Sequence, residues 1–372
     1  MDLLVFDTRM PVGGSHLRKA LFSAARCCSS VAGAGPRVTA EHRRQLAEDG
    51  VTVVAGVLAP DFVTELRTVS ASLCADPSLA HLQEDAFTGS LIPVGRDAAF
   101  AQLVALPAAL DVFGQFGWSP PSLRWMSGFV ISKPGQSPSL GWHQDGWFWD
   151  EQVAYEQCAP AAPAPAQVFA MYYLADTSAA NGCLRVLPGS HRAPGHALHA
   201  ALGRAHSEEV RSASEGGWQQ RPEHGEHAGA VDVPVRAGDL VLGDARVLHG
   251  ARRNSTDERR SLVTLWYMPR FDGLSNRMQQ GVSALHQHQC ADVRHGWAEG
   301  VPHLPGLLPP LVHQGLASDG AGEFDHNLKF MDRTPGFVAS ASEAAREAYC
   351  TCALAIETVE SGLVDKEDKW GR

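Results

Sequence analysis

Short apolar runs separated by Gly, Pro and Asn fill the middle of this chain, and they constrain its fold more than any other feature. Such runs predict β-strands, and no helix-length segments of the kind that a parallel sheet needs stand between them. The pattern therefore predicts an antiparallel jelly roll, in the mainly β class with flanking helices (α+β). The predicted strands are residues 123–133, 142–145, 167–175, 183–187, 231–235, 239–243 and 261–269.

Helices are predicted on both sides of these strands. Thr39 is a candidate N-cap for a helix that ends at Gly50, and a strand is expected over 51–58. Residues 60–75 have apolar side chains at helical spacing, and a helix over 98–116 should be interrupted near Pro107. We divide the chain into three parts: a disordered or targeting leader (1–38), a β domain with N-terminal helices (39–335), and a C-terminal helix with a charged tail (336–372).

The stretch Gly-Trp-His-Gln-Asp-Gly-Trp contains a pair of potential metal ligands, His143 and Asp145. On an extended strand these two side chains point to the same side, so both can bind one ion. A third ligand must come from a strand that the fold brings close, and His249 follows a turn and an apolar strand-like run. Two imidazoles and one carboxylate on one face of a metal are the ligand set of non-haem Fe(II) oxygenases.

Arg260 stands at the start of the next strand-like run, after a polar hairpin loop. An arginine that points into the same barrel would hold the far end of a dicarboxylic acid. Arg259 is the alternative, because a shift of one residue exchanges the two faces of a strand.

Several stretches resemble the phytanoyl-CoA dioxygenase (PhyH) family of Fe(II)/2-oxoglutarate-dependent oxygenases. These stretches occur in the order and rough spacing that the family uses, and the resemblance covers residues 40–275. The stretches are 45–54, Ser132-Lys-Pro-Gly135, Asn181-Gly-Cys-Leu-Arg-Val-Leu-Pro-Gly-Ser-His191, Ala237-Gly-Asp239, and the segment from His249 to Arg260 with Asn254. The resemblance implies a double-stranded β-helix (cupin-like) core, with Fe(II), O2 and 2-oxoglutarate as co-substrate. Lys133 and Met171 align with inward-facing positions that line the pocket in similar proteins, and a structural role is the equal alternative for each.

The resemblance implies hydroxylation of an unactivated C–H bond in a small-molecule or lipid-like substrate, with release of succinate and CO2. Asp145 argues against halogenation, because halogenating relatives have a small residue in place of the carboxylate. Desaturation and rearrangement stay open. Two alternatives come from other classes: a non-catalytic cupin-like module that binds metal or ligand, and a zinc hydrolase that uses the same three ligands.

Two other groups of histidines compete with this site. His224-Gly-Glu226-His227 lies in a polar stretch typical of a surface loop, and His286-Gln-His288 lies beyond the last predicted strand. We interpret both as solvated. The residues do not identify the substrate. A group of aromatic residues after the metal pair fits either a pocket wall or the core: Trp147, Phe148, Trp149 and Tyr155.

Composition bears on partners and location. A net charge of −10 gives no basis for binding nucleic acid or an anionic membrane surface. No apolar run is long enough to span a bilayer. The eight cysteines are scattered, which favours an intracellular, by default cytoplasmic, protein with reduced thiols. Organelle targeting by the N-terminal segment is the alternative. The expected partner is a small-molecule substrate, and the expected state is a monomer or a homodimer.

Overall fold

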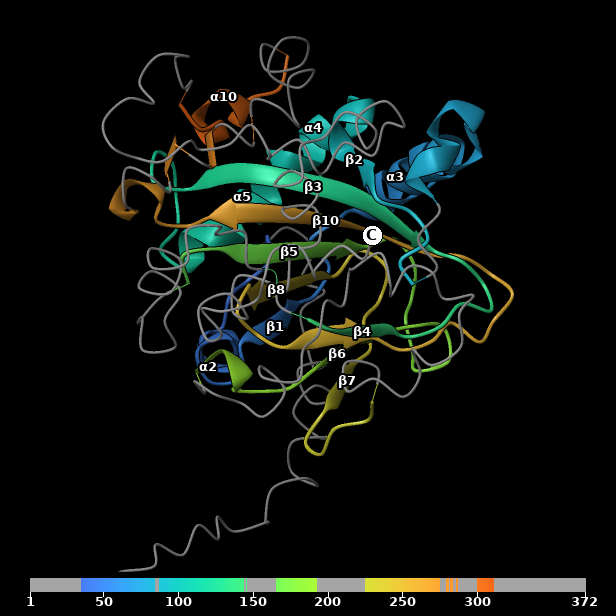
Figure 1. Ribbon diagram of the computed structural model, residues 1–372. Coiled ribbons are helices and arrows are strands. Elements are labelled where there is room, and N and C mark those ends of the chain that lie inside the picture. Colours follow the sequence, from blue (N-terminus) through green and yellow to red (C-terminus); the bar gives the residue numbers. More distant parts are fainter. Residues whose placement is uncertain are drawn as a thin grey trace, which may run out of the picture.

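Two antiparallel sheets form the centre of the molecule (Figure 1). The computed structural model describes residues 35–83, 87–143, 145, 165–192, 225–274, 279–280, 282–283, 286 and 300–310. The large sheet has the spatial order β1 (Val51–Val54), β8 (Leu240–Asp244), β5 (Val168–Tyr173), β10 (Arg260–Met268), β3 (Arg124–Lys133) and β2 (Ile92–Pro93). The small sheet has the order β4 (Leu140–His143), β9 (His249–Ala251), β6 (Leu184–Val186) and β7 (Val231–Val233). This architecture confirms the predicted jelly roll.

Strand β10 lies inside the large sheet and pairs with both β3 and β5. Its alternate side chains point to opposite faces, as the pleat of a strand requires. One row enters the core between the sheets, and the other packs beneath the helices. The inward row consists of Arg260, Leu262, Thr264 and Trp266.

Helices cover the outward face of the large sheet, where one apolar core joins them to the strands. In Figure 1, α3, α4 and α10 lie along β3. The helices of this layer are α2 (Ala40–Glu48), α3 (Pro60–Ala75), α4 (Ala99–Val104), α5 (Pro107–Gln115) and α10 (Leu304–Leu307). The short 3₁₀ helices are η1 (Pro77–Leu82), η2 (Val94–Arg96), η3 (Ser190–Arg192) and η6 (Phe271–Gly273).

Local sequence signals account for the ends of these helices. The hydroxyl of Thr39 accepts a hydrogen bond from the His42 N–H at 3.2 Å, which confirms the predicted N-cap of α2. Gly50 follows that helix with a φ of +84°, a conformation that glycine adopts without strain. The predicted helix over 98–116 is divided into α4 and α5 at Pro107, because proline has no N–H to continue the helix.

The predicted ends of the chain lie largely outside the described residues. Val38 belongs to the outer core, and its N–H donates to Gln115 Oε1 at 2.8 Å. The rest of the predicted leader (1–38), the predicted C-terminal helix and tail (336–372), and most of the stretch between Arg192 and Glu226 are not described, so the division into three parts stays a prediction. Among the described residues, no helix has the length and apolar character to cross a membrane.

Candidate metal centre

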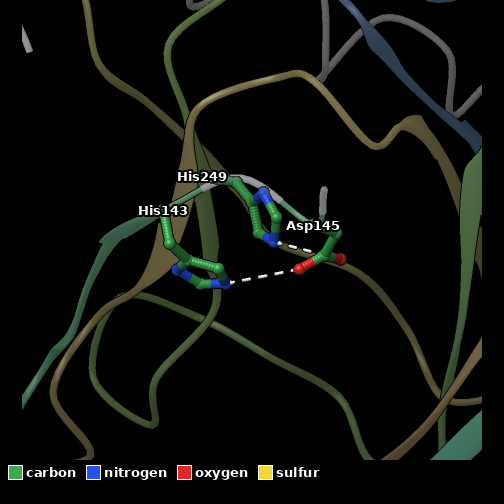
Figure 2. Close-up of side chains that lie close together, drawn as sticks. All are labelled: His143, Asp145 and His249. Carbon is green, nitrogen blue, oxygen red and sulfur yellow. Dashed lines mark ion pairs between the residues drawn. The ribbon is translucent and has the colours of Figure 1, made fainter. Parts of the chain in front are cut away.

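The three predicted ligands meet on the inner side of the small sheet. His143 ends β4 and His249 begins β9, and these two residues are register partners in the antiparallel pair. Their rings lie side by side with centroids 4.2 Å apart. Asp145 follows β4, and its backbone N–H donates to the carbonyl of Ala245 at 2.8 Å, which fixes the position of the carboxylate. Figure 2 shows both imidazoles directed at this carboxylate.

The distances within this group suit a metal ion better than hydrogen bonds. His143 Nε2 lies 3.7 Å from Asp145 Oδ1, and His249 Nε2 lies 3.7 Å from Asp145 Oδ2. These separations exceed the hydrogen-bond range. The candidate ligand atoms of the three buried residues all lie within 4.8 Å of one another. One ion with bonds of about 2.0–2.2 Å to each residue would fit between them.

Hydrogen bonds on the far side of each ring fix its orientation and its tautomer. His143 Nδ1 lies 2.8 Å from the carbonyl of Gly141, and His249 Nδ1 lies 3.0 Å from the carbonyl of Val247. A carbonyl only accepts, so each Nδ1 must carry the proton and each Nε2 keeps its lone pair. His249 Nε2 is buried without a hydrogen-bond partner. The donor set therefore fits a metal ion bound through both Nε2 atoms.

Two aromatic residues that the sequence analysis did not single out support this group. Trp266 donates its indole N–H to Asp145 Oδ2 at 2.9 Å. The ring of Phe169 lies 4.9 Å from the ring of His249. Phe169 occupies the space above Gly243, where an added Cβ would lie 2.0 Å from its Cζ. Glycine at 243 thus lets Phe169 pack against the second imidazole.

Arg260 points into the interior, and its neighbour in sequence does not. The side chain of Arg260 is 4% exposed, and its Nε and Nη1 have no hydrogen-bond partner. Its Cζ lies 5.9 Å from the centre of the Tyr173 ring. Burial lowers the pKa of Arg260, and burial raises the pKa of Tyr173 to about 12. Arg259 is exposed and donates to the carbonyl of Ser132 at 2.9 Å, so the structure places Arg260 inside and Arg259 outside.

Lys133 and Met171 both lie in the inward rows, as predicted. Lys133 is the register partner of Arg260, and its buried ammonium donates to the carbonyls of Phe87 and Pro138. Met171 is buried in the inner core. Contact of either side chain with a co-substrate stays a prediction.

The competing histidines behave differently from one another. The interpretation of His286 as solvated was wrong: its ring is fully buried, 5.0 Å from Trp125, and its Nδ1 lies 3.1 Å from the carbonyl of Met126. His286 therefore packs against β3. His227 is half-buried, with its ring edge-on to Trp142 on the outer side of the small sheet. His224, His288 and the predicted aromatic group, Trp147, Phe148, Trp149 and Tyr155, lie outside the described residues.

Comparison with known proteins agrees with this geometry. The sequence profile of the family described as phytanoyl-CoA dioxygenase (PhyH) matches residues 46–262. The chain belongs to this family. Membership confirms, at the level of the family, the predicted Fe(II)/2-oxoglutarate-dependent dioxygenase and its predicted fold.

Similar proteins include an ectoine dioxygenase of Nocardia farcinica (strain IFM 10152). It is 28% identical over an alignment of 241 residues that covers 60% of this chain and 76% of that protein. Among solved structures, the non-haem alpha-ketoglutarate-dependent epimerase SnoN is 23% identical, with a TM-score of 0.44 over 61% of this chain and 81% of its own. EctD from S. alaskensis, solved with 2-oxoglutarate and 5-hydroxyectoine, is 19% identical, with a TM-score of 0.45 over 66% of this chain and 81% of its own.

Proposed function

We propose that this member of the family is an active Fe(II)- and 2-oxoglutarate-dependent dioxygenase that hydroxylates an unactivated C–H bond of a small-molecule or lipid-like substrate and releases succinate and CO2. One observation carries the proposal: a buried cluster of two histidines and one carboxylate shares the interior with a buried arginine whose Nε and Nη1 lack partners. A structural metal site or a zinc hydrolase needs the cluster but gives no reason for the arginine.

Each residue of the site has a separate task in this proposal. His143, Asp145 and His249 would hold the iron on one face. When bound together with 2-oxoglutarate and O2, the iron would supply the oxidising power for the C–H bond. Arg260 would bind the distal carboxylate of 2-oxoglutarate through two parallel hydrogen bonds from one edge of its guanidinium, and one of its two unpartnered nitrogens, Nε or Nη1, would donate one of them.

Succinate formation tests the proposal directly. The protein would be purified without oxygen and then given Fe(II), 2-oxoglutarate and O2, with ectoine as the first candidate substrate because one relative is an ectoine dioxygenase. We expect iron-dependent succinate from the wild type and none from His143→Ala. His227→Ala, a histidine outside the cluster, is the matched control and should behave as the wild type.

The alternatives predict other results. If a panel of small metabolites gave no iron-dependent succinate, even uncoupled from substrate oxidation, a non-catalytic metal- or ligand-binding module would be favoured. Hydrolysis that depends on zinc and on His143 would favour the hydrolase.

A further inference from the structure

Trp266 connects the large sheet directly to the carboxylate of the candidate metal centre. Its indole N–H donates to Asp145 Oδ2 at 2.9 Å. Both side chains are buried, Asp145 with 3% and Trp266 with 6% of its surface exposed. A hydrogen bond to a carboxylate in such surroundings is stronger than one between neutral groups. One carboxylate oxygen thus accepts a hydrogen bond before any ion binds.

Both partners of this hydrogen bond are held in place. The backbone of Asp145 is bonded to Ala245, as described above. Trp266 lies in the inward row of β10, and its ring meets Phe129 edge-on, with ring centroids 5.7 Å apart. Because the interior is close-packed, the indole cannot turn away from the carboxylate without displacing its neighbours.

We infer that Trp266 is a positioning residue that limits Asp145 to a single metal-binding oxygen. The inference rests on the proposed function. Oδ1 faces His143 Nε2 at 3.7 Å, and Oδ2 lies 3.7 Å from His249 Nε2. Without the indole, both oxygens would therefore be within reach of one ion. The indole occupies one lone pair of Oδ2 and lowers its electron density, so Oδ1, which keeps both of its lone pairs, is the preferred oxygen for the metal.

The number of oxygens that Asp145 contributes determines how many positions stay open. A carboxylate that binds through one oxygen fills, together with two imidazoles, three positions of an octahedral ion and leaves three. Carboxylates also bind through both oxygens, and this would fill a fourth position. The second oxygen would then compete with 2-oxoglutarate and O2, which together require three positions. Trp266 would thus preserve the position that O2 requires.

Two phenylalanine variants separate this role from general packing. Trp266→Phe removes the indole N–H and keeps an aromatic ring. Trp125→Phe is the matched control, because Trp125 is also fully buried and donates its indole N–H to the carbonyl of Ser127 at 2.9 Å, but it packs in the outer core. The full-length proteins would be loaded with Co(II), whose visible absorption reports coordination number. 2-Oxoglutarate binding to the loaded proteins would be measured by calorimetry.

We expect the Co(II) spectrum of Trp266→Phe to shift toward a higher coordination number. Because the second oxygen would compete with the keto acid, the dissociation constant for 2-oxoglutarate should rise, by about the 10-fold to 100-fold that loss of a partner of a metal ligand usually costs in metal affinity or activity. Trp125→Phe should match the wild type in both measurements. Trp266→Leu, which removes the donor with a differently shaped side chain, carries the same expectation and serves if Trp266→Phe does not fold.

Two results would overturn the inference. One is a donor-less variant with the spectrum and the 2-oxoglutarate affinity of the wild type. The other is a variant that binds metal more weakly but, once loaded, binds 2-oxoglutarate as tightly as the wild type, since Trp266 would then only stabilise the carboxylate. Failure of the proposed function is distinguishable, because it would be seen in the wild type itself, as a protein that forms no iron-dependent succinate or whose metal-loaded form binds no 2-oxoglutarate.

Discussion

The unpaired guanidinium of Arg260 should make the ligand-free protein less stable than a variant that lacks it. Each buried donor without a partner costs about 1–3 kcal/mol, and Arg260 has two such atoms, Nε and Nη1. Its contact with the Tyr173 ring, at 5.9 Å, offsets this cost by about 0.5–2 kcal/mol. Arg260→Met has an unbranched apolar side chain of similar length. We therefore expect it to raise the free energy of unfolding by roughly 1–4 kcal/mol when no ligand is bound.

The same variant should lose the stabilisation that 2-oxoglutarate gives. A ligand at 100 times its dissociation constant stabilises the folded state by about 2.7 kcal/mol. We expect a gain of this size in the wild type loaded with Co(II), and little or none in Arg260→Met. Arg259→Met is the control, because Arg259 is exposed, and it should change neither quantity by more than about 0.5 kcal/mol.

Urea unfolding followed by tryptophan fluorescence, with and without 2-oxoglutarate, measures both effects. The reasoning would be refuted by an Arg260→Met protein that is less stable than the wild type without ligand. It would also be refuted if 2-oxoglutarate stabilised this variant as much as the wild type.

Three further predictions address the surroundings of the site. An added methyl group at Gly243 would collide with Phe169, which packs against His249, so Gly243→Ala should weaken metal binding by about 10-fold or more in a chelator competition assay; unchanged affinity would show that Phe169 does not support the imidazole. Burial lowers the pKa of His191 below its ordinary value of 6.5. The unfolded chain then binds more protons than the folded one, so the free energy of unfolding should fall as the pH drops through about 6.5, and less steeply in His191→Gln; equal slopes in urea titrations would contradict this. Removal of metal by a chelator should lower the melting temperature of the metal-loaded protein, since an ion bound only by the folded state stabilises it. If the chelator left the melting curve unchanged, the result would argue against the metal centre.

The three residues of the candidate metal centre could be predicted from the sequence, although the geometric reason was only partly correct. Strand alternation correctly put His143 and Asp145 on one side. The strand ends at His143, however, and Asp145 is positioned by its backbone bond to Ala245. His249 could be predicted only as a residue on some later strand. Its pairing with His143 depends on the order of strands in the small sheet, which local patterns do not encode.

The remaining site features depend on register and on long-range packing. To choose between Arg259 and Arg260, one must know at which residue β10 begins, because a shift of one residue exchanges the two faces of the strand. Trp266 was missed because its contact with Asp145 joins positions 121 residues apart. Its even spacing from Arg260 was the available signal, since it places both on one face of the strand. His286 was misjudged because no local pattern in the sequence marks it as a residue that packs against β3.

Strand β10 carries Arg260 and Trp266 in the same row, and this arrangement would tie their two proposed tasks to one length of chain. Insertion or deletion of one residue between them would turn one of the pair toward the helices, so anion recognition and ligand geometry could not both survive it. The number of residues between Arg260 and Trp266 is therefore more restricted than the identity of those residues. Selection for a new substrate is expected to act on connections between strands and to leave the length of β10 unchanged.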